Sequence, residues 1–173
     1  HGRDRRQRQM CIRDSPNGAL KVRYIEENGV KNGILTRLDS LGNILQSEIY
    51  ENDTLVGKGI IDSTGLKTGF WVFYYRSGQK SIEGYYKSGQ RSGKWIYYFE
   101  DGKIEQEGYY NEDVPDGAWT WYYSSGQIRK QENYYKGQYE GEVVDYDQEG
   151  NVLQERTFSY RYEEGQHFYY IGD

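Results

Sequence analysis

The chain is poor in the residues that most catalytic and metal sites require. Its 173 residues contain one cysteine, Cys11, and two histidines. A single cysteine excludes an internal disulfide framework. Structural zinc sites and histidine-based triads need several such groups at defined spacing, and none are clustered here. We therefore expect no enzymatic activity, no metal and no cofactor.

Long apolar runs and an excess of positive charge are also missing. No stretch of 18 apolar residues occurs, so the sequence predicts no membrane span. The formal net charge is −5, which disfavours a nonspecific nucleic-acid surface because such surfaces need a dense cationic field. No signal peptide is visible, and on that ground alone we favour the cytoplasm, although the compartment stays unknown.

Glycine, in contrast, is abundant and regularly spaced. The 22 glycines include an opening series and a turn series that share one fixed step. The opening series is Gly69, Gly93, Gly117 and Gly141, and the turn series is Gly78, Gly102, Gly126 and Gly150. A constant step of about 24 residues is typical of a repeat architecture. Repeat architectures favour an extended binding surface over a deep catalytic pocket.

Each repeat has the pattern of one β-hairpin. A run rich in aromatic and β-branched residues ends at an X-Gly turn, and a second, more polar strand follows. That strand ends in an aromatic pair, and one tyrosine of each pair recurs with the same step, at Tyr86, Tyr110 and Tyr134. Short loops such as residues 87–93 are expected to join the units. We predict an all-β fold, an elongated antiparallel β-meander of about six tandem hairpins, each of about 24 residues, in a single or curled layer.

The repeats are expected to cover residues 16–173. Residues 1–15 have no repeat character and resemble translated sequencing-adapter read-through, so we interpret them as a non-native or disordered leader. The spacing between Gly57 and Gly69 has a surplus of half a unit, which indicates an extra strand or a bulged loop containing Thr64 and Gly65. The chain stops one position before the next turn glycine is due, so we interpret the array as truncated at the C-terminus.

The alternation of side chains along a strand predicts an aromatic ladder on one face. Its members are Trp71, Phe73 and Tyr75, then Trp95, Tyr97 and Phe99, then Trp119, Trp121 and Tyr123. One interpretation is structural: the tryptophans pack on glycines of neighbouring hairpins and on each other. The other is that the ladder forms a groove for a protein partner, because tryptophan and tyrosine dominate binding hot spots. The two interpretations are compatible.

The remaining candidates for chemistry are weak. His167 occupies the repeat position held by Trp95 and Trp119, and we interpret it as a divergent residue of a terminal repeat. His1 lies in the leader. The glycines are spaced for hairpins and do not form a phosphate-binding loop.

The segment from Tyr86 to Gly102 resembles the MORN repeat, of the form Tyr-x-x-Gly-x-x-x-Gly-x-Trp-x-x-Tyr-x-x-x-Gly. More closely, it is similar to bacterial MORN-variant repeat proteins of the YwqK-type antitoxin family. The match continues to Gly126, except that Asp113 replaces the glycine equivalent to Gly89, and it fades after Gly141, where Val143 replaces the tryptophan. The resemblance implies a β-meander that contacts a protein partner, such as a toxin that it neutralises.

Two alternatives remain open. The run from Phe70 to Gly78 also resembles choline-type cell-wall-binding repeats, which implies an aromatic cage for a quaternary ammonium or a glycan. Those repeats are shorter than the units of this chain. A purely structural role would instead involve self-association through the unpaired end strands.

Overall fold

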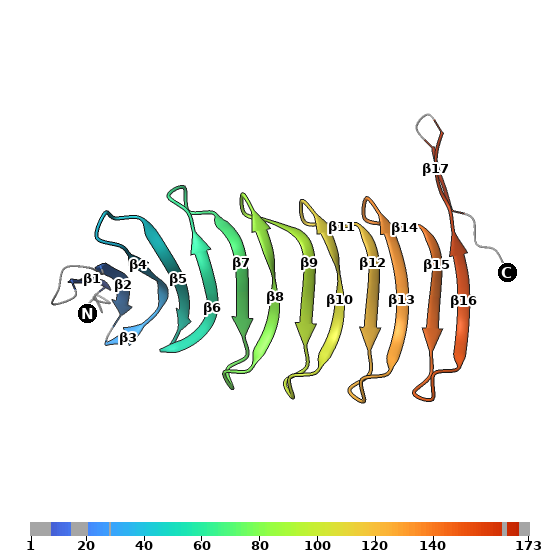
Figure 1. Ribbon diagram of the computed structural model, residues 1–173, viewed down its shortest axis with the longest axis horizontal. Helices are drawn as coiled ribbons and strands as arrows, with labels where there is room; N and C mark the ends of the chain where they lie inside the picture. Colours follow the sequence, from blue (N-terminus) through green and yellow to red (C-terminus); the bar gives the residue numbers. More distant parts are fainter. Residues whose placement is uncertain (1–7, 15–20, 28, 164–165, 170–173) are drawn as a thin grey trace, which may run out of the picture.

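A computed structural model shows a long, single-layer antiparallel sheet (Figure 1). It describes residues 8–14, 21–27, 29–163 and 166–169. The strands follow each other across the sheet in chain order, as in a meander, and within the described residues no helix occurs. No described element lies over the strands in Figure 1, so both faces of the sheet are uncovered. The predicted fold class is confirmed.

Sixteen strands form the main sheet, thirteen of them along one path and three short ones beside it. The path is β1 (Arg8–Asp14), β2 (Lys21–Glu27), β4 (Gly33–Leu38), β5 (Ile44–Glu51), β6 (Thr54–Ile61), β7 (Lys67–Tyr74), β8 (Lys80–Lys87), β9 (Gln90–Tyr98), β10 (Ile104–Asn111), β12 (Gly117–Tyr122), β13 (Ile128–Tyr135), β15 (Gly141–Tyr146) and β16 (Val152–Phe158). The short strands are β3 (Val30–Lys31), β11 (Val114–Pro115) and β14 (Gln138–Tyr139), which pair with β2, β10 and β13.

The glycines of the turn series lie in the turns that join the strands at the bottom of Figure 1. Between β7 and β8, the Gly78 N–H donates to the Tyr75 carbonyl at 2.9 Å, and the Tyr75 N–H donates to the Gln79 carbonyl at 2.8 Å. Gly78 has a φ of 88°, a conformation that glycine adopts without the steric cost of a side chain. The same pair of bonds recurs in the turns that contain Gly102, Gly126 and Gly150.

The connections at the other ends of the strands differ from the sequence-based expectation. Residues 87–93 do not form a connecting loop: β8 ends at Lys87, Ser88 and Gly89 make a two-residue turn, and β9 begins at Gln90. Ser88 and Gly89 have φ values of 50° and 84°, as the two central residues of a type I′ hairpin turn require. The units are therefore joined by a second hairpin, and the meander is continuous.

The surplus half-unit forms an extra strand. β6 and β7 are joined by a turn at Asp62–Gly65, which contains the Thr64-Gly65 pair singled out in the sequence. Strand β7 consequently has a glycine-containing turn at each of its ends. As a result, the turns with Gly42 and Gly65 lie at the top of Figure 1, whereas the turns of the Gly78 series lie at the bottom.

The two ends of the chain carry strands beside the regular repeats. The backbone of Arg8–Asp14 forms β1 and pairs with β2, while residues 1–7 and 15 lie outside the described part, so the division into a leader and a repeat array stays a prediction. At the other end, β17 (Tyr160–Glu163) and β18 (Gln166–Tyr169) form a separate two-stranded sheet. The main sheet therefore ends at Phe158, and His167 lies in the separate hairpin.

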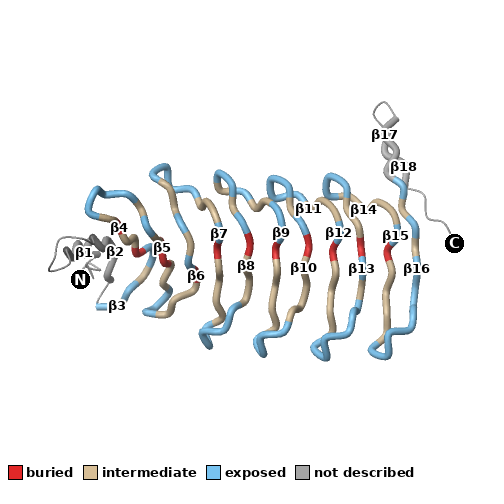
Figure 2. Tube along the Cα trace, in the orientation of Figure 1, coloured by how far each residue is buried: buried red, intermediate tan, exposed pale blue. Residues whose placement is uncertain are grey.

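Buried residues form a band through the strand centres (Figure 2). From β7 to β15 the band consists of Trp71, Gly84, Trp95, Gly108, Trp119, Glu132 and Val143. These residues lie opposite one another on neighbouring strands, as in the paired positions Trp71–Gly84 and Gly84–Trp95. The core of this protein is therefore a line across one sheet, and no second layer is needed to bury it.

Candidate functional site

Each repeat tryptophan lies flat against a glycine of the preceding strand. A Cβ atom placed on Gly84 would be 2.3 Å from the Trp95 ring, and one on Gly108 would be 2.0 Å from the Trp119 ring. Gly59 has the same relation to Trp71, at 2.4 Å. Real Cβ atoms cannot approach so closely, so only glycine permits this contact. The three tryptophans therefore pack on glycines, as the structural interpretation expected, but among the described residues no ring contact joins them to each other, because repeat tyrosines lie between them.

The indole N–H groups complete the same arrangement. Trp95 Nε1 donates to the Tyr85 carbonyl at 3.2 Å, and Trp119 Nε1 donates to the Tyr109 carbonyl at 3.1 Å. Each acceptor follows the glycine under the ring. At Gly84–Tyr85 the strand register shifts, and a carbonyl at such an irregularity needs a partner outside the regular ladder. The indole therefore supplies both the apolar cover and this hydrogen bond.

Aromatic rings form a continuous row along this face, which we call the tryptophan face. Trp95 contacts Tyr86 and Tyr110 edge to face, with ring centroids 5.0 and 6.2 Å apart. Trp119 contacts Tyr110 at 5.0 Å and Tyr134 at 6.3 Å in the same manner. Such geometries are the favourable ones for aromatic pairs. The repeat tyrosines thus separate and orient the indoles.

The ladder residues have three different environments. Trp71, Trp95 and Trp119 are 0%, 2% and 4% exposed, so their indoles support the sheet and offer little surface to a partner. The middle members are half-buried on the same face: Phe73, Tyr97 and Trp121. The last members lie beyond the strand ends, in the turns: Tyr75, Phe99 and Tyr123. Partner binding by the ladder stays a prediction, and it concerns mainly the middle members.

Cationic side chains cover the row in two successive units. Lys67 Nζ lies 5.1–5.4 Å from the ring centroids of Trp71, Phe73 and Tyr86. Arg91 occupies the equivalent position one repeat later, with its guanidinium carbon 3.8 Å from the centroid of Tyr110. Distances under about 6 Å are typical of cation–π interactions. Each cation therefore lies over the repeat tyrosine of the adjacent strand in its own hairpin, and Lys67 also lies over two rings of its own strand.

Arg91 is held in place by the residue that departs from the repeat pattern. Asp113, which stands where the preceding unit has Gly89, accepts hydrogen bonds from Arg91 Nε at 2.8 Å and from the Arg91 backbone N–H at 3.0 Å. The guanidinium lowers the pKa of the Asp113 carboxyl below its ordinary value. The substitution therefore adds an ion pair at the turn while keeping the positive φ, here 68°.

In the next unit Pro115 replaces the cation, and a hollow of about 230 Å³ is present. Its walls include the rings of Tyr110, Trp119, Trp121 and Tyr134, with Pro115 and Gln106 completing the lining. Trp119 and Trp121 hold the repeat positions that Trp71 and Phe73 hold two units earlier.

A buried carboxylate lies beyond this hollow. Glu132, 4% exposed, accepts hydrogen bonds from the hydroxyls of Tyr134 at 2.8 Å and Tyr139 at 3.0 Å, and it is ion-paired with Lys130. Burial, followed by the hydrogen bonds to Tyr139 and Glu132, raises the pKa of Tyr134 above its ordinary value. Tyr134 therefore stays a neutral donor at physiological pH.

The opposite face carries a second, more exposed set of aromatic residues. Phe70, Tyr85, Tyr109 and Tyr135 are each 45–55% exposed. Phe70 and Tyr85 are in contact, with centroids 5.1 Å apart. None of the four was among the predicted site residues. The tyrosine pairs are the feature that could have indicated them, because consecutive strand residues point to opposite faces.

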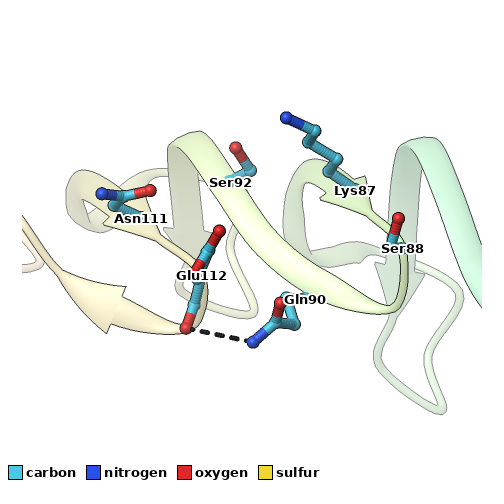
Figure 3. A pocket seen from close by; sticks show the side chains of 6 residues that line it. All are labelled: Lys87, Ser88, Gln90, Ser92, Asn111 and Glu112. Carbon is cyan, nitrogen blue, oxygen red and sulfur yellow. Dashed lines mark hydrogen bonds between the residues drawn. The ribbon is translucent and has the colours of Figure 1, made fainter.

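A smaller hollow of about 110 Å³ lies beside the two-residue turns (Figure 3). It is lined by Lys87, Ser88, Gln90, Ser92, Asn111 and Glu112. The Gln90 side-chain amide donates to the Glu112 carbonyl at 3.5 Å across it. All of its side chains are polar and solvated, so it has no apolar wall that would favour a ligand over water.

Within the described residues no cluster of three His, Cys, Asp or Glu side chains could hold a metal ion. Across the same part of the chain, no helix has the length and hydropathy needed to span a bilayer.

Three of the hairpin units match the model of a known repeat family. Residues 91–112, 115–136 and 139–160 each match the MORN repeat variant. Three segments of this protein are therefore similar to MORN-variant repeats. The matched segments include Arg91, the hollow residues Pro115 and Trp119, and both Glu132 and Val143. The antitoxin assignment receives no support from the match itself. No curated protein matches the chain.

Two solved structures share a low similarity with the chain. One is described as accessory secretory protein 1, 2 and 3 in Streptococcus pneumoniae, with 15% identity over 79% of this chain and a TM-score of 0.24. The other is a GtfA/B complex bound to UDP and GlcNAc, with 14% identity over 70% of this chain and a TM-score of 0.21. The chain spans 18% and 21% of the length of these two proteins.

Proposed function

We propose that this MORN-variant repeat protein is a non-catalytic protein-binding module. The observation that carries the proposal is the uncovered tryptophan face, where half-buried aromatic side chains continue from one repeat to the next. Contiguous aromatic surface that is partly exposed is typical of interaction sites. A rigid sheet presents it at little entropic cost, because the buried indoles fix the backbone beneath it.

The more specific role that we propose is neutralisation of a toxin. This role rests on the resemblance to YwqK-type antitoxins. It fits an elongated sheet, which could cover an active site on another protein without any chemistry of its own. The net charge of −5 favours a partner with a basic surface.

The experiment is a binding measurement with the product of a toxin-like reading frame adjacent to the intact gene. Coexpression should restore growth, and titration calorimetry should show a stoichiometric complex. The variant Phe73→Ala/Tyr97→Ala removes two half-buried rings from the tryptophan face. It should weaken binding by tenfold or more, which corresponds to a loss of at least about 1.4 kcal/mol in binding free energy. Trp95 is unsuitable for this purpose because it is buried.

The matched control removes two aromatic rings from the other face. Phe70→Ala/Tyr85→Ala should leave the affinity within about twofold, since exposed substitutions away from an interface are close to neutral. Circular dichroism checks that both variants keep their strands. Loss of binding in the control alone would show that the wrong face has been assigned. If neighbouring proteins bind none of the variants or the unmodified chain, the antitoxin role is excluded.

A further inference from the structure

The hollow at Pro115 has the geometry of a cation site whose own cation has been replaced. In three successive units, the position of the cation is held by Lys67, Arg91 and Pro115. In the first, Lys67 Nζ lies 5.1–5.4 Å from the ring centroids of Trp71, Phe73 and Tyr86. Two repeats later, the equivalents of these four residues are Pro115, Trp119, Trp121 and Tyr134. The ring positions are kept, Phe73 is enlarged to a tryptophan, and only the basic side chain is missing.

The intermediate unit shows that the position accepts either kind of basic side chain. Arg91 places its guanidinium carbon 3.8 Å from the Tyr110 centroid, and its Nη1 lies 3.4 Å from the Tyr97 hydroxyl. An ammonium and a guanidinium are therefore both bound by this arrangement of rings within the same sheet. Proline cannot supply a charge, and the hollow of about 230 Å³ lies beside it.

The electrostatics of the hollow also favour a cation. Four aromatic residues line it, and the negative potential of an aromatic face attracts positive charge. Arg91 already lies over Tyr110, so the three rings of Trp119, Trp121 and Tyr134 are the ones that remain for a second cation. Tyr134 at its wall donates its hydroxyl proton to the buried carboxylate of Glu132. The cation on the adjacent strand, Lys130, is paired with Glu132 and lies 5.8 Å from the ring of Tyr139, and it does not line the hollow.

We propose that the hollow formed by Tyr110, Trp119, Trp121 and Tyr134 binds a lysine or arginine side chain of a protein partner, which takes the place that Lys67 and Arg91 fill in the preceding units. This proposal names the chemistry of one contact in the proposed interface. It rests on the proposed function only in assuming that the basic side chain belongs to a protein partner. The affinity of one such contact is small, and it contributes specificity within a larger interface.

The four tryptophans provide a direct measurement with an internal control. The probes are N-acetyl-arginine and N-acetyl-lysine methylamides, and the readout is the ¹⁵N–¹H spectrum of the indoles. The indole signals of Trp119 and Trp121 should shift with saturation at millimolar probe. The signals of Trp71 and Trp95 should not, because Lys67 and Arg91 already occupy their units. N-acetyl-alanine methylamide should move none of the four.

Two variants exchange the properties of the units. Pro115→Lys restores the internal cation and should weaken probe binding at Trp119 and Trp121 by about tenfold or more. Lys67→Ala removes the internal cation and should create probe-dependent shifts at the Trp71 indole. The gain at a second place cannot be explained by unfolding, so this variant keeps the test decisive even if Pro115→Lys disturbs the adjacent turn.

Equal shifts at all four indoles, or none at Trp119 and Trp121, would overturn the proposal. Saturation by choline at concentrations well below those of the basic amides would also overturn it, and would favour the cell-wall-binding alternative. These outcomes are independent of the partner experiment, since free probes report on the hollow even if no toxin binds. Binding of the amides without any protein partner would leave the cation site established and the proposed module unsupported.

Discussion

The central repeats and the last repeat fill the same buried position with different pairs of residues. In the centre, a tryptophan lies on a glycine, as Trp95 does on Gly84. In the last repeat, Val143 occupies the tryptophan position and Glu132 the glycine position, each one period after Trp119 and Gly108. Val143 is 0% exposed and Glu132 is 4% exposed, so neither position has opened to solvent.

The two positions change size in opposite directions, since valine is smaller than tryptophan and glutamate is larger than glycine. Both stay buried, so burial at this place does not require an indole on a glycine. A buried carboxylate is costly unless it is paired and hydrogen-bonded. The chain meets this requirement with Lys130, Tyr134 and Tyr139, all of which contact the carboxylate.

The largest effect is expected from deleting a central indole. Trp95→Ala should destabilise the protein by about 3–5 kcal/mol, the usual range for removing a buried tryptophan. Val143→Ala in the last repeat removes two methyl groups and should cost roughly 2 kcal/mol or less. Urea unfolding followed by tyrosine and tryptophan fluorescence gives both values, and the strand signal by circular dichroism shows whether the whole sheet unfolds together.

An equal loss of stability in the two variants would contradict the idea that the indoles are the main source of burial. As a control, Phe70→Ala removes an aromatic ring from the exposed face, where it is 46% exposed. Its effect should stay near zero, within about 0.5–1 kcal/mol.

A second prediction tests whether the two residues of a pair are coupled. Gly84→Ala places a methyl group 2.3 Å from the Trp95 ring and should cost about 1–3 kcal/mol through overpacking. In a Trp95→Val background the indole is absent, and the same substitution should be nearly neutral or stabilising. Urea midpoints of the four proteins form a double-mutant cycle, and the expected coupling is at least about 1 kcal/mol.

The matched control repeats the double-mutant cycle with a glycine that does not contact an indole. A Cβ atom placed on Gly126 would meet no atom within 4 Å, but the φ of this residue is 94°, so Gly126→Ala reports backbone strain alone. Its cost should be the same with Trp95 or with Val at that position. Additive effects at Gly84 and Trp95 would mean that the indole moves freely, and the interpretation of the pair would be wrong.

The period of the glycines was sufficient to predict the strands, the glycine turns and the shared face of the tryptophans. These features depend on local backbone preferences and on alternation, both of which are visible in the sequence. The joining segment 87–93 was mispredicted because polar residues such as Gln90 and Ser92 suggested a loop. In the structure they continue β9, since pairing with β8 outweighs their low strand propensity.

The candidate site could be predicted only in part. The ladder was identified, but its division into buried indoles and half-buried middle members depends on which glycine lies beneath each ring. Gly84 and Gly108 are themselves one period apart, so this third series was available in the sequence. The hollow at Pro115 could not be foreseen, because it is recognised only once Lys67 and Arg91 are seen to lie over rings of the adjacent strand.

The smallest expected effect concerns the turn that departs from the repeat pattern. Asp113→Asn keeps a residue that tolerates positive φ but removes the ion pair with Arg91. Because Arg91 lowers the pKa of Asp113 in the folded state, the stabilisation is present above the ordinary value of 3.8 and disappears as the pH falls through the lowered value. The pair is partly exposed, so the loss at pH 7 should be about 0.2–1 kcal/mol.

Urea unfolding at pH 7 and at pH 2 should therefore show a difference between Asp113→Asn and the unmodified protein that shrinks toward zero in acid. In an Arg91→Gln background the difference should be small at both pH values, because the charged partner of Asp113 is gone. A difference that persists unchanged at pH 2 would show that Asp113 acts through its backbone conformation. The turn at Asp113 would then be stabilised in the same way as the turn at Ser88–Gly89, without a contribution from the ion pair.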